Sequence, residues 1–130
     1  MIGLEQVSFG YGEKQETLSH VSATVARGEC VLLCGASGCG KTTTLRMIAG
    51  LETPTSGRIT IGDTVVFDSE LGINIPANKR KVGFLFQNYA LWPNMTVYEN
   101  ISYGLKLKKA PKEEKDRKVA EMLELSLIHI

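Results

Sequence analysis

A cluster of three glycines, Gly35, Gly38 and Gly40, separates an apolar run from the start of a helical pattern. The run "ECVLLCG" is typical of a strand buried on both faces, and "KTTTLRMIA" before Gly50 predicts a helix from about Lys41 to Ala49. Glycine loses more backbone entropy on folding than any other residue, so such a cluster is kept where the chain must turn sharply or approach a ligand closely. The order of strand, glycine loop and helix indicates an α/β fold.

The glycine cluster matches the pattern G-x-x-x-x-G-K-[ST], which is a phosphate-binding loop. Glycines let successive backbone N–H groups converge on an anion, and the helix N-terminus adds its positive dipole end. Lys41 is predicted to reach the β- and γ-phosphates of a nucleotide, and the Thr42 hydroxyl to bind Mg²⁺. A tight turn without a ligand is the alternative. The predicted nucleotide-binding residues of the loop are Gly35, Ala36, Ser37, Gly38, Cys39, Gly40, Lys41, Thr42 and Thr43.

Composition narrows the class of protein. Fifteen basic and fourteen acidic residues give a net charge of +1, so charge does not indicate nucleic acid as a partner. No run approaches the roughly 20 apolar residues that cross a bilayer, and the N-terminus lacks a signal-peptide pattern. Three cysteines without metal-ligand spacing fit reduced thiols in the cytoplasm. Cys30 and Cys34 are expected in the core, whereas Cys39 is expected to be reactive beside Lys41 and the helix N-terminus.

The rest of the chain supplies strands and one polar helix. The segments "EQVSFGYG" and "LSHVSATVARG" alternate as antiparallel strands do, and "RITIGDTVVF" predicts a strand pair around Gly62 and Asp63. "KVGFLFQ" is a second apolar strand, and a solvated helix after Pro111 would pack through Val119, Met122 and Leu123. The predicted fold is therefore a phosphate-loop core sheet with an antiparallel β subdomain, incomplete at its C-terminal half.

Three segments carry a resemblance to a known family: "SFGYG", "GASGCGKTTTLRMIAGLETPTSGRITIGD" and "KVGFLFQNYALWPNMTVYENISYGLKL". They resemble the ATP-binding subunit of ABC transporters, in particular of bacterial importers. The resemblance implies ATP and Mg²⁺ as cofactors, with Tyr11 stacking on adenine and Gln87 bridging Mg²⁺ and the attacking water. Lys41 and Gln87 would be catalytic, and Thr42 and Gln87 would bind the metal. Tyr11 as a strand residue packed on the sheet is the alternative.

The same resemblance implies partners. The region after Gln87, with its aromatic residues and Pro93, would receive the transmembrane permease subunits, unless it is an ordinary partly buried loop. A second ATP-binding subunit would complete a head-to-tail dimer, and the protein would lie on the inner face of the cell membrane.

Three family features do not occur in the 130 residues: an LSGGQ-like signature, an apolar strand ending in Asp-Glu and a switch histidine. Residues 1–125 are therefore expected to be the N-terminal part of an ABC ATP-binding domain, with apolar edges that lower solubility. Residues 126–130, "SLIHI", are expected to be a non-native tail, because codons for this stretch resemble the end of a transposase-type sequencing adapter. A naturally short paralogue is the alternative.

Two classes of function follow. In the first, the chain represents the ATPase of an importer, with hydrolysis driving solute uptake; in the second, it binds nucleotide without turnover. The stretch "FDSELGINIPANKRKVGFLFQ" looks most like ATPases of molybdate, tungstate and sulfate importers, so an oxyanion is the favoured solute, with a sugar or a polyamine as alternatives. A phosphate-loop kinase or GTPase is a more distant alternative, which would lack the setting of Tyr11 and Gln87.

Overall fold

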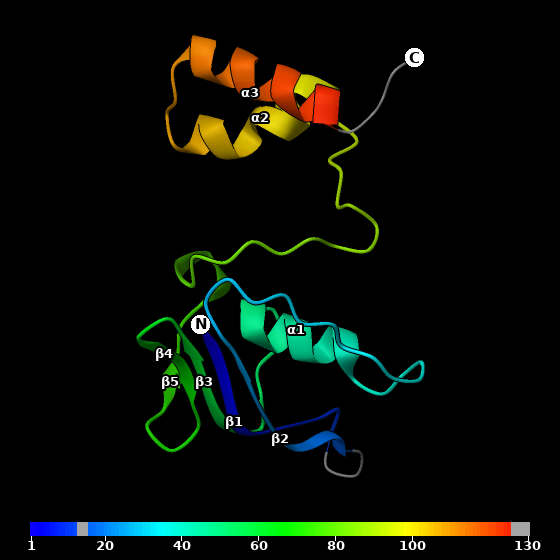
Figure 1. Cartoon of the computed structure of the whole chain (residues 1–130), viewed down its shortest axis with the longest axis vertical. Coiled ribbons are helices and arrows are strands. Elements are labelled where there is room, and N and C mark those ends of the chain that lie inside the picture. Colours follow the sequence, from blue (N-terminus) through cyan, green and yellow to red (C-terminus); the bar gives the residue numbers. More distant parts are fainter. Residues whose placement is uncertain (13–15, 126–130) are drawn as a thin grey trace. The chain divides into compact units, whose positions relative to one another are not determined.

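The structure is a computed structural model that describes residues 1–12 and 16–125, in two units, Met1–Phe84 and Leu85–Ile130. The first unit holds an antiparallel sheet in the order β2-β1-β3-β4-β5 (Figure 1). The predicted tail, residues 126–130, lies outside the described residues. The sheet is formed by β1 (Ile2–Gly10), β2 (Glu16–Val25), β3 (Ser56–Ile61), β4 (Thr64–Asp68) and β5 (Ile73–Asn74).

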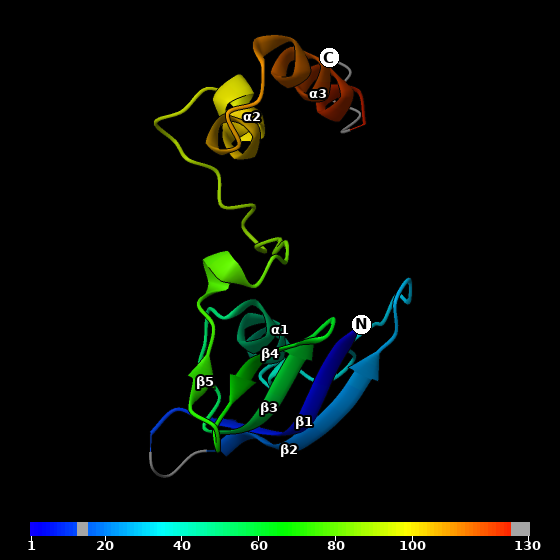
Figure 2. The same cartoon turned by 90° about the vertical axis from the view of Figure 1, so that its left-hand side faces the viewer.

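Helix α1 (Lys41–Ala49) covers one face of this sheet, as Figure 2 shows. Met47 is fully buried and joins a core formed by apolar residues of three strands. The buried positions depart from a strict alternation, because β1 has a register shift between Leu4 and Val7, and Val66 and Phe67 of β4 are both buried. The two-layer packing confirms the α/β class and the antiparallel subdomain. The core residues from the strands are Leu4, Val7, Phe9, Ile59, Val66 and Phe67.

The two apolar runs predicted as buried strands are not strands in the described chain. Residues 30–35 and 81–86 lie in no helix or strand, and Leu32 and Leu85 are 83% and 82% exposed. A strand buried on both faces needs hydrogen-bonded strands at both edges, and the sheet of residues 1–12 and 16–125 is formed by β1 to β5 without either run. Cys30 and Cys34 are consequently exposed, so their predicted place in the core is wrong.

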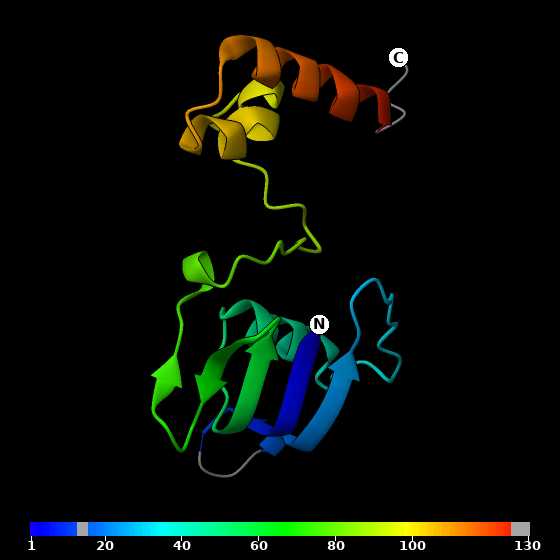
Figure 3. The same cartoon turned by 60° about the vertical axis from the view of Figure 1, so that its left-hand side comes forward.

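The second unit contains α2 (Val97–Leu107) and α3 (Lys112–Leu125), which pack on each other (Figure 3). Helix α3 confirms the predicted polar helix, although Val119 alone of its three predicted packing residues is buried. Helix α2 was not predicted. It begins with a capping box in which Thr96 and Glu99 exchange side-chain to backbone hydrogen bonds. Within the described parts of the chain, no helix is long and apolar enough to cross a membrane.

Candidate functional site

The loop before α1 has a backbone that only glycine adopts easily. Gly38 and Gly40 have φ angles of 79° and 93°, in the left-handed region. A Cβ atom on Gly40 would also lie 2.6 Å from Cδ2 of Leu18, a residue of β2. Residues 35–39 are exposed, while Gly40 is buried against the sheet. The loop thus extends into solvent and returns to the sheet at Gly40, the residue before α1.

The ammonium group of Lys41 lies against the carbonyl oxygens of the loop. Its Nζ donates hydrogen bonds of 2.7 Å to the carbonyls of both Gly35 and Ala36, and Sγ of Cys39 lies 3.6 Å away. The loop therefore holds a cation at the N-terminus of α1, where the first N–H groups of a helix have no partner within the helix. Such a site favours an anion, because the positive end of the helix dipole and the lysine charge act together.

The hydroxyl groups of the first turn of α1 differ in their partners. Thr44 is buried, and its Oγ1 donates to the carbonyl of Gly40 at 2.9 Å. Thr42 is exposed, and its hydroxyl makes no hydrogen bond within residues 1–12 and 16–125. No group of three His, Cys, Asp or Glu side chains in that part of the chain is arranged to hold a metal ion. An oxygen-preferring ion at this site would be bound through Thr42 and a phosphate ligand, which fits Mg²⁺.

Tyr11 follows the end of β1 and is connected to the loop through two packed side chains. Its ring meets that of Phe9 edge to face, with centroids 4.8 Å apart. Phe9 is buried and pairs with Leu18 across β1 and β2, and Leu18 packs on Gly40. Tyr11 itself is 61% exposed, so one unit contains the loop, Lys41, Thr42 and an aromatic ring open to solvent.

Gln87 and the region after it belong to the second unit. Gln87 is exposed and follows the apolar run directly. Tyr89 and Leu91 are 73% and 71% exposed, and Trp92 is anchored through its backbone N–H, which donates to Oδ1 of Asn100 at 2.9 Å. The region is therefore an apolar and aromatic surface held at one end by α2.

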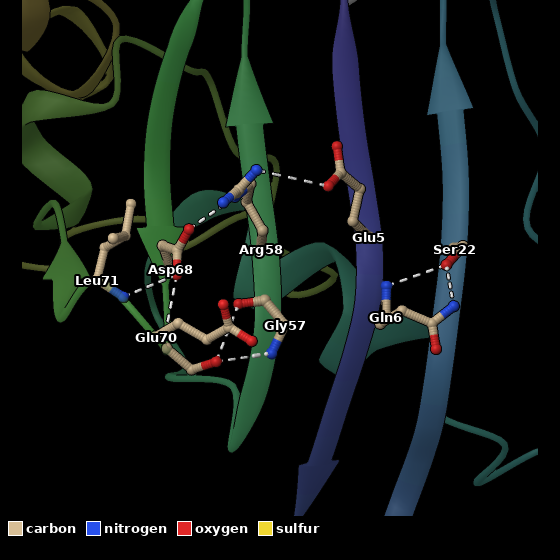
Figure 4. A network of polar contacts seen from close by, with 9 residues as sticks. Glu5, Gln6, Ser22, Gly57, Arg58, Asp68, Glu70 and Leu71 are labelled. Carbon is tan, nitrogen blue, oxygen red and sulfur yellow. Dashed lines mark hydrogen bonds and ion pairs between the residues drawn. The ribbon is translucent and has the colours of Figure 1, made fainter.

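A polar cluster on the outer face of the sheet was not found in the sequence. Arg58 donates to Asp68 at 2.6 Å and lies 3.8 Å from Glu5 (Figure 4). The backbone N–H groups of Leu71 and Glu70 also donate to Asp68, and these bonds together with Arg58 hold the pKa of its carboxyl below its ordinary value. Arg58 and Asp68 are partners in the β3–β4 register because a shift between Ile59 and Thr60 moves it by one residue, so the predicted turn at Gly62 and Asp63 does not by itself pair them.

The comparisons with known proteins agree on one family. The family model described as ABC transporter matches residues 18–129. The trehalose/maltose import ATP-binding protein MalK of Thermococcus litoralis is 55% identical over 105 residues, which cover 81% of this chain and 28% of that protein. The sn-glycerol-3-phosphate import ATP-binding protein UgpC of Brucella abortus is 51% identical over 120 residues, which cover 92% of this chain and 32% of that protein.

A solved structure agrees with these relatives. The dimeric post-hydrolysis state of the ATP-binding cassette MJ0796, bound to ADP and Pi, matches 95% of this chain and 56% of its own, with a TM-score of 0.79 and 30% identity. The chain spans about a third of the length of the two curated relatives, 28% and 32%.

Proposed function

Because the chain belongs to the ABC transporter family, we propose that it binds ATP with Mg²⁺ through the loop from Gly35 to Thr43, as part of the ATP-binding subunit of an importer. The observation that carries the proposal is the Lys41 ammonium held over an exposed glycine loop at the N-terminus of α1. Each backbone N–H that donates to a charged phosphate contributes roughly 1.5–3 kcal/mol, so a loop of several donors gives useful affinity.

Each site residue has a role in this proposal. Tyr11 stacks on the adenine ring, for which an exposed aromatic face suffices. Lys41 exchanges the carbonyls of Gly35 and Ala36 for phosphate oxygens. Thr42 is the proposed Mg²⁺ ligand of the first unit, and the ion would neutralise phosphate charge. For Gln87, in the second unit, the family resemblance implies a metal ligand whose amide would also orient the attacking water. Lys41 and Gln87 are thus the proposed catalytic residues.

The proposed solute differs from the sequence-based preference. The two relatives are import proteins for trehalose/maltose and for sn-glycerol-3-phosphate, and neither name includes molybdate or sulfate. These identities of 55% and 51% outweigh the likeness of one polar loop to oxyanion importers. The proposal is therefore corrected to a sugar or glycerol phosphate, with a polyamine retained as the alternative because a spermidine/putrescine import ATP-binding protein is 48% identical.

Permease subunits and a second ATP-binding subunit are the proposed partners. The exposed Tyr89, Leu91 and Trp92 supply an apolar surface after Gln87 that suits a permease contact. Docking there would hold the protein on the inner face of the membrane. The dimeric state of the MJ0796 cassette supports pairing of two subunits.

Nucleotide binding without turnover is the second candidate. Binding requires the phosphate loop, which residues 35–43 contain, whereas the family resemblance implies that turnover also requires an LSGGQ-like signature. Phosphate release from ATP separates the two candidates, since both require binding and only the first produces phosphate.

The test is a calorimetric titration of the chain with ATP in Mg²⁺ and in EDTA. We expect binding in both, tighter with Mg²⁺, and a smaller difference between the two in Thr42→Ala. Thr24→Ala is the matched control, because Thr24 is an exposed β2 residue far along the chain from the loop. Absence of binding at millimolar ATP, in protein with an intact circular dichroism spectrum, would overturn the proposal.

A further inference from the structure

Arg80 is a buried arginine whose partners are all neutral. It is 3% exposed, and its Nε donates to the carbonyl of Ile75 at 2.6 Å. Nη1 donates to the carbonyls of Met47 and Ile48 at 2.8 and 3.1 Å, and Nη2 donates to Oδ1 of Asn74 at 3.1 Å. No ion pair joins Arg80 to a carboxylate in the described ranges. A buried charge without a counter-ion is costly unless its donors are satisfied, so these four bonds explain why it is kept.

Two of the four acceptors are backbone carbonyls in the last turn of α1. The last carbonyls of a helix have no partner within the helix, and a cation there also interacts favourably with the dipole. Arg80 satisfies both needs for Met47 and Ile48. Its other two acceptors, Ile75 and Asn74, belong to the segment that leaves the sheet at β5.

Gly50 makes room for this contact. It ends α1 with a φ angle of 78°, and its N–H donates to the carbonyls of Arg46 and Met47. A Cβ atom on Gly50 would lie 2.6 Å from Nε and 2.9 Å from Cζ of Arg80. The guanidinium group therefore packs directly on the end of the helix, and a side chain at this position is excluded by both conformation and space.

Helix α1 is short, so its two ends move together. Nine residues rise about 13 Å, and a helix of this length behaves as a rigid rod. Its N-terminus contacts Leu18 at Gly40, and Thr44 is buried near its middle. Its last turn is held by Met47 in the core and by Arg80. A change of tilt at the last turn consequently displaces Lys41 and the N–H groups at the first.

We propose that Arg80 is a positioning residue for the phosphate loop: by joining the last turn of α1 to the segment after β5, it fixes the direction in which the first turn and Lys41 face a nucleotide. The inference rests on the proposed function for its ligand, ATP. Its geometric part, the link between Arg80 and the conformation of the loop, does not require a nucleotide.

The experiment uses the whole chain with Arg80→Met, Arg80→Lys and the matched control Arg58→Met. Arg58 is in the same sheet, but its partners are Asp68 and Glu5 on the outer face rather than α1. Two quantities are measured at a temperature where circular dichroism shows each variant folded. They are the affinity for MgATP by calorimetry and, without nucleotide, the rate at which iodoacetamide alkylates Cys39, resolved from Cys30 and Cys34 by peptide mass spectrometry.

We expect Arg80→Met to weaken MgATP binding about tenfold, the scale of one lost charged hydrogen bond. The same variant should change the Cys39 alkylation rate about threefold or more, because thiol reactivity depends on the charges near the sulfur. Arg80→Lys keeps the charge but loses the fork of donors, so both effects should be partial, and Arg58→Met should alter neither quantity.

If Arg80→Met and Arg58→Met have the same MgATP affinity and the same Cys39 alkylation rate, whatever their thermal stability, the inference is overturned. If Arg80→Met does not fold, Arg80→Lys decides, and an unchanged Cys39 rate in that variant contradicts the proposal. If the unsubstituted chain fails to bind MgATP, the proposed function fails. The alkylation rates still test whether Arg80 determines the conformation of the phosphate loop.

Discussion

The Nζ atom of Lys41 lies 2.7 Å from the carbonyl oxygen of Gly35, so the lysine braces the loop that it is proposed to serve. We expect Lys41→Ala to weaken MgATP binding about tenfold or more, because a charged hydrogen bond to phosphate is worth roughly 1.5–3 kcal/mol. Calorimetric titration measures the change.

Lys79→Ala is the control for this substitution, because Lys79 is an exposed lysine of the same unit, in the short helix Ala77–Lys79. It removes the same charge from the protein without touching the loop, and its affinity should equal that of the unsubstituted chain. Parallel losses in both variants would mean that overall charge, rather than the position of Lys41, determines binding.

Cys39 gives a second test of the same loop. It is exposed, and its sulfur lies 3.6 Å from Nζ of Lys41. We expect alkylation by N-ethylmaleimide to abolish MgATP binding, and MgATP to slow the alkylation, because a nucleotide would cover the sulfur. Cys30 and Cys34 are exposed in the same protein and serve as internal controls, whose labelling MgATP should leave unchanged. Equal labelling of Cys39 with and without MgATP, in protein that binds it, would contradict the prediction.

Local patterns predicted the elements that local interactions form. Helix α1 has the predicted bounds, Lys41 to Ala49, because glycines stop it at both ends. The hairpin of β3 and β4 turns at Gly62 and Asp63 as expected, and the alternating strands at the N-terminus pair as predicted. In each case the residues that determine the element lie within it or beside it.

The two wrongly predicted strands and the unpredicted helix α2 differ in how far their signals are local. The runs at 30–35 and 81–86 have strand composition, but a strand forms only where neighbours pair with it, and pairing is not a local property. Helix α2 has a local signal in the sequence, the capping box of Thr96 and Glu99, so its formation does not depend on such pairing.

The candidate site shows the same contrast between residues with a local signal and residues that depend on non-local contacts. The spacing of Gly35, Gly40 and Lys41 predicts the phosphate loop, because the residues of this pattern lie together in the sequence. Arg80 gave no signal, because two of its acceptors are backbone carbonyls at positions 47 and 48, more than thirty residues away, on a helix whose contacts the sequence does not reveal.

Leu32, 83% exposed, is expected to reduce solubility. Large apolar side chains on an unpaired run favour association between chains. We expect Leu32→Lys to raise the soluble fraction after centrifugation and to lower light scattering, with an unchanged circular dichroism spectrum. Leu4→Lys is the contrasting variant, since Leu4 is 6% exposed in the core and a charge there should unfold the sheet. No gain in solubility for Leu32→Lys would show that association involves another surface.

The capping box at Thr96 should stabilise α2. Its side chain accepts from the N–H of Glu99, and Glu99 accepts from the N–H of Thr96. Thr96→Ala should lower the free energy of unfolding by about 1 kcal/mol and reduce the helical signal in circular dichroism. Thr96→Ser should retain most of this stability, because serine also caps a helix. Val97→Ala, at an exposed position of the same turn, keeps the cap and controls for a general effect of substitution. An equal loss of stability and helical signal in Thr96→Ala and Val97→Ala would contradict the role of the cap.

The lowered pKa of the Asp68 carboxyl predicts how the stability of the fold depends on pH. The N–H groups of Leu71 and Glu70 and the guanidinium of Arg58 hold the pKa of its carboxyl below the ordinary value of about 3.9. The folded state therefore binds this proton less readily than the unfolded state does. The stabilisation is fully present above about pH 4 and is lost as the pH falls through the lower pKa of the folded state.

Asp68→Asn removes the charge at every pH, so it should lower the thermal midpoint near neutral pH. Because the carboxyl of the unsubstituted chain becomes neutral in acid, the difference between the two proteins should shrink as the pH falls below about 4. Scanning fluorimetry across this range measures the difference. Glu70→Gln is the control: its carboxylate is exposed, so its substitution should produce a smaller shift. The difference in thermal midpoint between Asp68→Asn and the unsubstituted chain could instead stay constant down to about pH 2. That result would mean that the hydrogen-bond geometry of Asp68, and not its charge, stabilises the outer face of the sheet.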